Sequence, residues 1–379
     1  QMQNLKQIRL NEISDVMELM VMEDMVKKRK TYAYERGLYS MPIYEVSANV
    51  PSKLPIMSED LPKNRIGLSK WLFDKKNPLT SRVAVNRYWQ MIFGRGIVNT
   101  PGDFGVQGSP PSHPELLNFL SNYLIENNWN IKALLKLMVN SHTYMQSSIR
   151  NEKYAQIDSD NIFLSRNNSY RLPAEMIRDN ALAASGLMVK NVGGKSVRPY
   201  QPKGLWIEKS TFSLKLLNYK ESLGDSLYRR SMYTFIRRTS PPPNMSVFDA
   251  PTREVCTVKR EITNTPLQAL VLLNDPQFFE ASRILAERMQ KEAPNSINES
   301  ISYGFRLCTS RNPKEKELTL LKELYFKQLD KFKKNPKLAY EIFKSGEKPR
   351  DRTLNRYKTA AMSMVANTML NHDKAYMKR

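Results

Sequence analysis

Residues 237–276 read RRTSPPPNMSVFDAPTREVCTVKREITNTPLQALVLLNDP and join a candidate strand to two candidate helices. Three consecutive prolines at 241–243 hold the entry extended, because proline fixes φ and has no amide hydrogen to donate. The residues that follow are polar and show neither a helical nor a strand period. A polar connection of this length inside a compact domain is more often functional than filler. Any chemical site of this domain is therefore expected in its middle, from Phe248 to Glu254.

Signals for a turn and for two helix starts lie inside this stretch. Asp249 follows Phe248 in a turn signature, where its carboxylate can accept backbone hydrogen bonds. Thr265 and Gln268 have the spacing of a capping box, with a proline between them at the first helical position. Asn-Asp-Pro at 274–276 ends that helix and caps the next one. The stretch therefore predicts a long loop followed directly by two helices.

Apolar residues recur at helical spacing on both sides of this stretch. Ser112 and Glu115 form a second capping-box signature, and Asn130 is placed to cap the helix after it. Alternating residues flanked by arginine pairs make 228–238 the best strand candidate. The segments predicted to be helical include 66–73, 81–93, 113–126, 131–139, 171–188, 266–274, 276–289, 314–334 and 355–371.

The predicted fold is mainly α, a multi-helix bundle with long Pro/Gly-rich loops and a small β element near 228–238. Residues 1–29 are typical of a helix with an extended exit. Four prolines and little periodicity make 30–64 an extended connector. We expect residues 1–64 to form one part and residues 65–379 the helical domain, with a sub-boundary near 150–170 where the sequence is polar and asparagine-rich.

The chain has 59 Lys plus Arg residues against 37 Asp plus Glu, a formal net charge of +22. This balance favours anionic partners such as acidic glycans or lipid headgroups, or it is a basic surface set by the protein's environment. No zinc knuckle, RNA-binding strand signature or basic zipper accompanies the charge, so nucleic acid is not an expected partner. No apolar run is long enough to suggest a transmembrane helix.

The 379 residues include only two cysteines and three histidines. Cys256 and Cys308 either form one disulfide or remain as two buried thiols. No C-x-x-C or C-x-x-C-H motif occurs, so this chain has no covalent haem attachment site and no zinc motif of its own. His113 belongs to a helix cap and His142 to an apolar helix face, and both are predicted to be structural. We expect no metal site and no cofactor in this chain.

Several polar side chains are candidates for one network around the middle of the 237–276 stretch. A buried arginine–carboxylate–amide network can bind a polar ligand, or it can simply fix a long loop, which is the role we expect. A separate ladder of Arg171, Glu175, Arg178 and Asp179 is predicted to be solvated or to link helices. The candidate network residues are Arg82, Asn86, Arg87, Asp249, Arg253, Glu254, Asn264 and Asn274.

Eight strings of the chain occur in the order found in one known family. They are NPLTSRVAVNRYWQMIFGRGIV (77–98), DFGVQGSPPSHPELL (103–117), NSHTYMQSS (140–148), RLPAEMIRD (171–179), YRRSMYTFIRRTSPPP (228–243), FDAPTREVCTVKR (248–260), NTPLQALVLLNDPQF (264–278) and MVANTMLN (364–371). Together they resemble the C-terminal domain of the planctomycete-type cytochrome C proteins of Planctomycetes and Bacteroidetes, from about Arg65 to the last residues. Residues 1–64, with ERGLY at 35–39, resemble the tail of the neighbouring domain of that family, also of unknown function.

The resemblance implies an exported cell-envelope protein, in the periplasm or at the outer membrane or cell surface. Many members carry an N-terminal c-type haem module, so haem c is expected in such a module and not in this chain. They are often encoded beside sulfatases and polysaccharide-degrading systems. Many relatives have paired histidines after the Trp-Gln of the first string, where this chain has Met91 and Ile92. That motif is therefore interpreted as architectural, and the family has no settled catalytic residues to carry over.

These observations leave three functions open, and they do not decide whether the chain is an enzyme. The first is the non-haem portion of a c-type-cytochrome-linked envelope system, with redox processing of carbohydrate as its activity. The alternative is a non-catalytic scaffold or binding module of an outer-membrane or surface complex. The third is a glycan-acting hydrolase, which needs two facing carboxylates, such as Asp249 with Glu175 or Asp103 with Glu115. Expected partners are envelope proteins, with acidic glycans and a peripheral membrane contact as further options.

Overall fold

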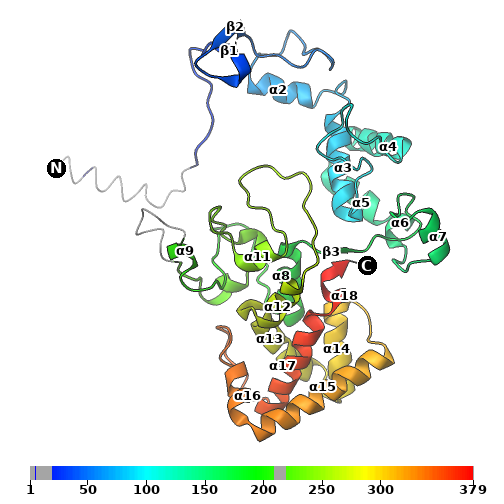
Figure 1. Cartoon of the computed structure of the whole chain (residues 1–379), viewed down its shortest axis with the longest axis vertical. Coiled ribbons are helices and arrows are strands. Elements are labelled where there is room, and N and C mark those ends of the chain that lie inside the picture. Colours follow the sequence, from blue (N-terminus) through cyan, green and yellow to red (C-terminus); the bar gives the residue numbers. More distant parts are fainter. Residues whose placement is uncertain (1–4, 6–18, 209–218, 379) are drawn as a thin grey trace. The chain divides into compact units, whose positions relative to one another are not determined.

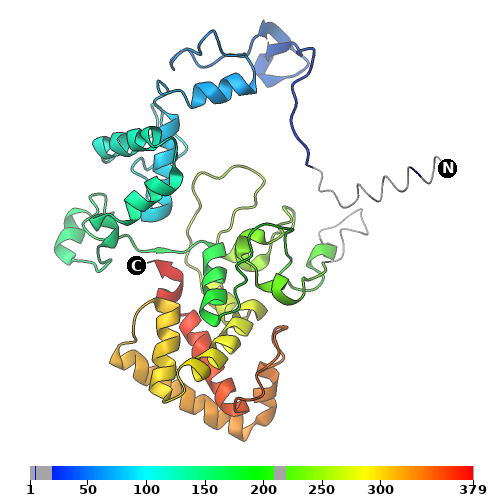
Figure 2. The same ribbon diagram turned by 180° about the vertical axis from the view of Figure 1, so that it is seen from behind.

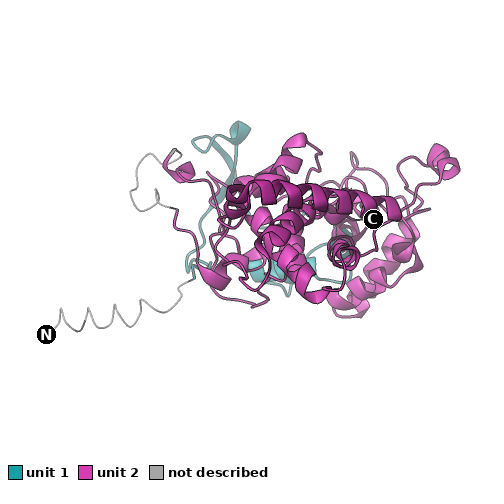
Figure 3. Ribbon diagram, turned by 90° about the horizontal axis from the view of Figure 1, so that it is seen from below, with its two compact units in different colours: residues 1–84 teal, residues 85–379 magenta. Residues whose placement is uncertain are grey.

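The computed structural model describes residue 5, residues 19–208 and residues 219–378. The described chain is mainly helical, and its sheets are two separate pairs of short strands (Figure 1). The predicted class, mainly α with a small β element, is confirmed. The chain divides into two compact units, residues 1–84 and residues 85–379, which Figure 3 colours separately. This division falls inside helix α3 (Thr80–Phe93).

The first unit contains a β-hairpin within the segment that we predicted to be an extended connector. Strands β1 (Thr31–Tyr34) and β2 (Pro42–Val46) pair antiparallel, and the 3-10 turn η1 (Glu35–Gly37) lies between them. The connector prediction is wrong here, because tyrosines and β-branched residues favour pairing between nearby strands. The helix predicted within residues 1–29 falls mostly outside the described residues, and residues 19–29 form the irregular approach to β1.

Helix α2 (Arg65–Leu72) follows the hairpin, as predicted. The side chain of Asn64 caps it by accepting from Gly67 N at 3.0 Å. Trp71 is buried, and its Nε1 donates to Pro55 O at 2.7 Å, which ties the helix to the segment before it. These contacts order the first unit around one helix and one hairpin.

Helices α3 to α7 carry the next part of the chain. They are α3 (Thr80–Phe93), α4 (Pro114–Glu126), α5 (Ile131–Val139), α6 (His142–Met145) and α7 (Glu152–Ile157). The capping box predicted from Ser112 is wrong, because its hydroxyl donates to Ile97 O at 3.2 Å and α4 begins after His113. Asn130 caps α5 as predicted, accepting from Ala133 N at 3.1 Å. Trp89 and Phe93 stack at 4.0 Å in the core of this part.

The C-terminal bundle consists of α8 (Ala174–Ser185), α12 (Pro266–Asn274), α13 (Pro276–Glu292), α14 (Ile297–Thr309), α15 (Glu315–Lys334), α16 (Pro336–Ile342), α17 (Arg356–Leu370) and α18 (Asp373–Tyr376). Helix α13 packs against α8, α14 and α17, and α17 also packs against α15, as Figures 1 and 2 show from opposite sides. Leu285, Met289 and Val365 are fully buried. A Cβ added to Gly304 of α14 would lie 2.5 Å from the Met289 sulfur, so glycine permits this close helix contact.

The end of the chain returns to α3. Strand β3 (Tyr170–Arg171) pairs antiparallel with β4 (Met377–Lys378). Lys378 Nζ donates to Ile92 O at 2.8 Å and lies 4.2 Å from the centre of the Tyr144 ring. Burial lowers the pKa of Lys378 below that of an exposed lysine. This contact explains how a two-residue strand holds its place.

The predicted strand at 228–238 does not form a regular strand. Its place is taken by the 3-10 turns η2 (Gly224–Tyr228) and η3 (Ser231–Tyr233) and by isolated bridges, among them Val189 with Arg229 and Val197 with Thr234. Its carbonyl groups go to separate partners: Tyr228 O accepts from Val189 N at 3.0 Å, Tyr233 O accepts from Val197 N at 2.8 Å, and Arg229 O accepts from the buried Arg178 at 2.9 Å. The alternating pattern therefore accompanies isolated bridges and no continuous ladder among the described residues.

The ion pair at the start of α15 should make the free energy of unfolding fall at acidic pH. Glu317 accepts from Arg311 Nη1 at 2.8 Å and from Lys314 N at 2.7 Å. The Arg311 guanidinium lowers the pKa of Glu317 to about 2 from its ordinary 4.5. The stabilisation is therefore complete above pH 4.5 and is lost as the pH falls through about 2. Glu317→Gln should cost about 1 kcal/mol at neutral pH and flatten the acid decline of the unfolding free energy.

Urea unfolding of Glu317→Gln at several pH values measures this effect. The matched control is Glu315→Gln, since Glu315 is an exposed carboxylate in the same helical turn. Identical pH profiles for the two variants would show that the Arg311–Glu317 pair contributes nothing specific.

Candidate functional site

The middle of the 237–276 stretch forms an exposed loop, residues 250–262, whose two ends are joined by Asp249. The Asp249 carboxylate accepts from Thr263 N at 2.8 Å and from Thr263 Oγ1 at 2.9 and 3.0 Å. Gln268 Nε2 donates to Val247 O at 3.0 Å and to Thr263 O at 3.2 Å. The capping box predicted from Gln268 is therefore wrong, because this side chain bridges the ends of the loop.

Arg171 anchors the same loop base from within the protein. Its guanidinium is an ion-pair partner of Asp249 and also donates from Nε to Thr263 O at 3.1 Å and from Nη1 to Phe248 O at 3.2 Å. Its side chain is 2% exposed. Burial lowers the pKa of Arg171, and Asp249 opposes that shift. The guanidinium is therefore committed to loop carbonyls and to one carboxylate.

Arg178 holds a second segment in the same manner. It donates from Nη2 to Leu227 O at 2.7 Å, from Nη1 to Arg229 O at 2.9 Å, and from Nε to Gln277 Oε1 at 2.9 Å. Burial lowers its pKa to about 10. The prediction of a solvated or interhelical ladder is wrong for Arg171 and Arg178. Both are buried arginines that bind the backbone of distant loops, because a guanidinium can satisfy several carbonyl groups at once.

The exposed part of the loop is held at its sides by Glu175 of α8. Glu175 pairs with Arg260 at 2.7 Å and with Arg253 at 3.7 Å. The backbone of Asp249 and Arg253 is left-handed, with φ of 58° and 63°. Non-glycine residues in this region carry strain that often accompanies function. Between these anchors the loop presents three apolar side chains to solvent, Val255 at 75%, Val258 at 36% and Ile262 at 54% exposure.

The remaining predicted residues of the stretch lie apart from Asp249. Glu254 is exposed, and its amide lies 3.5 Å from Thr252 Oγ1. Asn264 is also exposed. Asn274 donates to Leu270 O at 2.9 Å within its own helix. The structure thus joins Asp249 to residues outside the predicted network, and it pairs Arg253 with Glu175 of α8.

The predicted residues of α3 have their own local roles. Arg82 Nη1 donates to Pro78 O at 2.6 Å. Asn86 is fully buried, donating to Val98 O at 3.0 Å and accepting from Val98 N at 2.8 Å. Arg87 is exposed. The Asn86 amide therefore closes the glycine-containing turn after α3, and its hydrogen bonds go to Val98 and not to the loop base.

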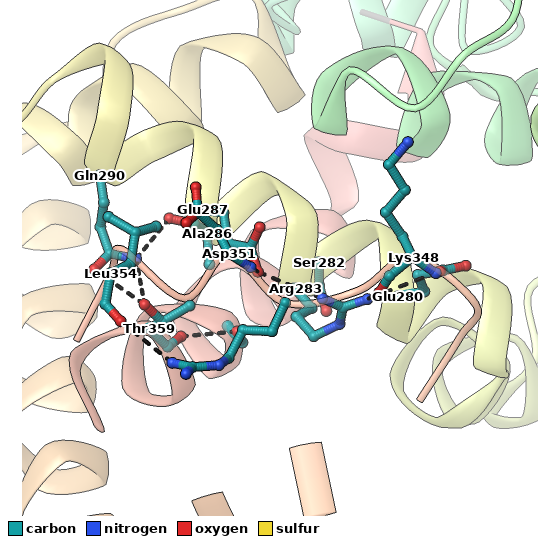
Figure 4. Close-up of polar contacts among 12 residues, drawn as sticks. Glu280, Ser282, Arg283, Ala286, Glu287, Gln290, Lys348, Asp351, Leu354 and Thr359 are labelled. Carbon is teal, nitrogen blue, oxygen red and sulfur yellow. Dashed lines mark hydrogen bonds and ion pairs between the residues drawn. The ribbon is translucent and has the colours of Figure 1, made fainter. Parts of the chain in front are cut away.

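A second polar cluster lies along α13 and was not predicted. Glu280, Arg283 and Glu287 lie on one side of the helix and face the segment that carries Lys348 and Asp351 (Figure 4). Arg283 Nη1 lies 3.4 Å from Glu287 Oε1, and Arg283 Nη2 lies 3.8 Å from Glu280 Oε1. Arg283 also donates to Lys348 O. Glu280 and Arg283 are fully buried, so each charge depends on these partners.

Glu280 is the centre of this cluster. It accepts from Tyr200 Oη at 3.0 Å, from Tyr228 Oη at 2.9 Å and from Lys348 N at 2.7 Å. Burial and the Glu280 carboxylate raise the pKa of both tyrosines, so they remain donors at neutral pH. The only sequence signal was the i, i+3, i+7 spacing of the three charges. This spacing is more typical of a solvated helix face.

The two cysteines should differ in their reactivity toward thiol reagents. Both are free, Cys256 exposed in the loop and Cys308 buried in the bundle, so the structure supports neither a disulfide nor two buried thiols. Burial raises the pKa of Cys308 to about 12. We expect Ellman's reagent to modify one thiol in the native protein and two in concentrated guanidinium chloride. Cys256→Ser should remove the native reaction. If both thiols react at once, Cys308 is not protected as described.

Among the described residues, no group of three or more His, Cys, Asp and Glu side chains has a geometry that could hold a metal ion. In the same part of the chain, no helix is long and apolar enough to cross a bilayer. The polar clusters that are present contain arginines with carboxylates, amides and tyrosine hydroxyls. The chemistry they offer is hydrogen bonding and charge compensation.

Comparison with known proteins places the chain in a family. A family model described as PSD1, protein of unknown function (DUF1553), matches residues 64–325, which is more than half of the chain. No curated protein and no solved structure matches the chain significantly. The match begins beside α2, includes the loop and its anchors, and ends in α15. The chain belongs to the PSD1 family of proteins of unknown function (DUF1553).

Proposed function

We propose that this protein is a non-catalytic binding module of a cell-envelope assembly, and that the 250–262 loop docks a protein partner. The observation that carries the proposal is the closure of this loop by Asp249, Thr263 and Arg171 while its apolar side chains face solvent. A loop with joined ends and a rigid base presents its tip with little entropy left to lose on binding.

The same contacts argue against a hydrolytic site at this loop. Asp249 is bonded to Thr263 and Arg171, and Glu175 is paired with Arg260 and Arg253. A glycan hydrolase needs one carboxylic acid that protonates the leaving oxygen. It also needs a second carboxylate that acts as the base or the nucleophile. Asp249 and Glu175, one of the two carboxylate pairs considered for that role, thus both serve to hold the loop.

The chemistry of the loop supports a protein partner. Val255, Val258 and Ile262 form an apolar centre, and the exposed Lys259 lies beside them. Such a surface fits a protein face with an apolar middle and acidic edges. The resemblance to the planctomycete-type cytochrome C family supports a c-type cytochrome as a component of the assembly. In this proposal haem c belongs to a separate module, and this chain contributes the docking surface.

The location and the other partners are part of the same proposal. The resemblance supports export to the periplasm, the outer membrane or the cell surface. The net charge of +22 supports a peripheral contact with acidic lipid or glycan in that compartment. Redox processing of polysaccharide would then be the activity of the assembly and not of this chain.

Cross-linking from Cys256 tests the proposal. Because Cys308 is buried, a benzophenone maleimide should label the loop selectively. The labelled protein is illuminated in a native envelope extract, and adducts are stained for haem peroxidase activity after denaturing electrophoresis, which covalent haem c survives. We expect a haem-bearing adduct that Val255→Asp removes without changing the unfolding midpoint.

A label in another exposed loop gives the control. Val192 is 81% exposed, so Val192→Cys combined with Cys256→Ser moves the reagent out of the 250–262 loop. The proposal fails if this variant gives the same adduct, or if Cys256 gives no adduct that contains haem.

A further inference from the structure

The hairpin of the first unit leaves its strands uncovered. Every residue of β2 is exposed, including Ile43 at 61%, Tyr44 at 62% and Val46 at 38%. The sheet has only two strands, so each strand has one edge without a neighbour in the sheet. Such an edge offers main-chain donors and acceptors to another chain, and an isolated hairpin is only marginally stable. Among the described residues, this surface therefore has no covering strand.

A cationic pocket of about 440 Å³ lies at the open end of the same hairpin. Lys28 and Arg29 line it just before β1, and Lys63 and Arg65 line it at the start of α2. Asp24, the carboxylate among its lining residues, is already paired with Arg65 at 2.5 Å. The first turn of α2 adds the partial positive charge of a helix N-terminus. Met25, Met57 and Leu68 also line the pocket, so it suits an anionic group on a short apolar stem, such as a glutamate side chain.

The chain connects these two features directly. Ala48 and Asn49 line the pocket and follow β2, which ends at Val46. The pocket thus includes residues from just beyond both hairpin strands. A strand added beside β2 would run along apolar side chains and reach this cationic pocket at one end.

We propose that the outer edge of β2 accepts an extended segment of a partner protein as a third strand, and that acidic residues at one end of that segment occupy the pocket. Main-chain hydrogen bonds would supply affinity, and the apolar side chains with the pocket would supply specificity. This interface is separate from the 250–262 loop and does not depend on the function proposed for that loop.

Charge favours an acidic protein segment over a second copy of the chain or a lipid surface as the occupant of this edge and pocket. Residues 27–30 are Lys-Lys-Arg-Lys, so a second copy paired in parallel would bring two basic runs together. A second copy paired antiparallel would bring the Glu35–Gly37 turn, which has no net charge, towards the pocket. A lipid surface could satisfy the cations but offers no strand to continue the ladder. An acidic, extended protein segment satisfies both the sheet edge and the pocket.

The probe is a fluorescent peptide of alternating valine and threonine that ends in glutamates, and its binding to the whole chain is measured by anisotropy. We expect saturable binding that weakens as salt increases. A peptide with lysines in place of the glutamates, and one with central prolines, should bind more than about tenfold more weakly.

Two variants test the two halves of the interface. Ile43→Lys places a charge on the sheet edge, and the pair Lys28→Glu and Arg29→Glu reverses the pocket. Each should weaken the acidic peptide more than about tenfold. Lys53→Glu changes an exposed lysine of the same unit outside the pocket and should have little effect. Far-ultraviolet circular dichroism and the unfolding midpoint establish that each variant is folded.

Several results would overturn the proposal. One is absence of binding to the acidic peptide, and another is equal binding of the lysine peptide. If Lys53→Glu weakens peptide binding as much as the pocket variant does, the binding depends on overall charge and not on the pocket. Sedimentation showing a dimer that Ile43→Lys dissociates would assign the edge to a second copy. Binding to phosphatidylglycerol vesicles, without binding to the peptide, would show that the pocket contacts a membrane and not a protein segment.

Discussion

Glu280→Ala is expected to destabilise the protein by about 3–5 kcal/mol, because it leaves the buried Arg283 without much of its compensating charge. It also removes the acceptor of Tyr200 Oη, Tyr228 Oη and Lys348 N. Buried donors without an acceptor add to the cost. Chemical unfolding monitored by circular dichroism measures the change.

A double-mutant cycle separates this charge effect from a simple cavity. The double variant Glu280→Leu with Arg283→Met replaces the buried charges by apolar side chains of similar size. We expect it to be more stable than the sum of its single variants predicts, since an apolar replacement removes both desolvation costs. Glu341→Ala is the surface control, because its partner Lys344 is exposed and the pair contributes little. Strict additivity of the two core variants would contradict the ion-pair account.

Arg178→Met should cost about 3–5 kcal/mol, for a different reason. Its guanidinium holds Leu227 O, Arg229 O and Gln277 Oε1, and no methionine group can replace those donors. The effect should therefore include local loss of order in the 224–233 segment. Hydrogen exchange measured by mass spectrometry should show faster exchange there than in α17.

Arg178→Lys provides the control for charge. Lysine keeps the positive charge but cannot form the planar array of hydrogen bonds made by arginine. We expect it to recover only a small part of the stability lost in Arg178→Met. Full recovery would mean that the charge matters and the bonds to the carbonyl groups do not.

Local sequence patterns predict most of the helices. The structure confirms the helices predicted from apolar spacing at α13 and α17. It also confirms the Asn-Asp-Pro signal before α13, where Asp275 accepts from Gln277 N at 2.9 Å. These signals work because capping and amphipathic packing depend on residues close in sequence. The class, mainly α, follows from the same patterns.

The failures share one physical cause, which is contact with residues distant in sequence. Arg171 and Arg178 have the spacing of a helical charge ladder, yet distant loops cover both side chains. Glu280 and Arg283 have the spacing of a solvated face, yet the segment near Lys348 covers them. Local periodicity cannot reveal such covering, because the same charges at the same spacing also suit an exposed helix.

The candidate site contains one residue whose role the sequence predicts and several partners that it does not. A turn signature correctly placed Asp249 as an acceptor of backbone hydrogen bonds. Its partner Arg171, 78 residues earlier in the chain, carried no local signal that linked the two. The chemistry of Asn264 and Asn274 and their proximity in sequence favour them as members of the network, but the structure gives them no hydrogen bond to Asp249. The capping-box signature assigns Gln268 to the neighbouring helix, and no local signal selects Thr263, although both hydrogen-bond at the loop base.

The central claim is that the buried polar groups hold the 250–262 loop and that the exposed side chains of this loop bind the partner. The most direct test measures the unfolding midpoint and the Cys256 cross-link together in two variants, Asp249→Ala and Val255→Asp. The account predicts that Asp249→Ala lowers the midpoint and weakens the cross-link as the loop loses its base. It predicts that Val255→Asp abolishes the cross-link at an unchanged midpoint. An unchanged midpoint in Asp249→Ala, together with an intact cross-link in Val255→Asp, would contradict it.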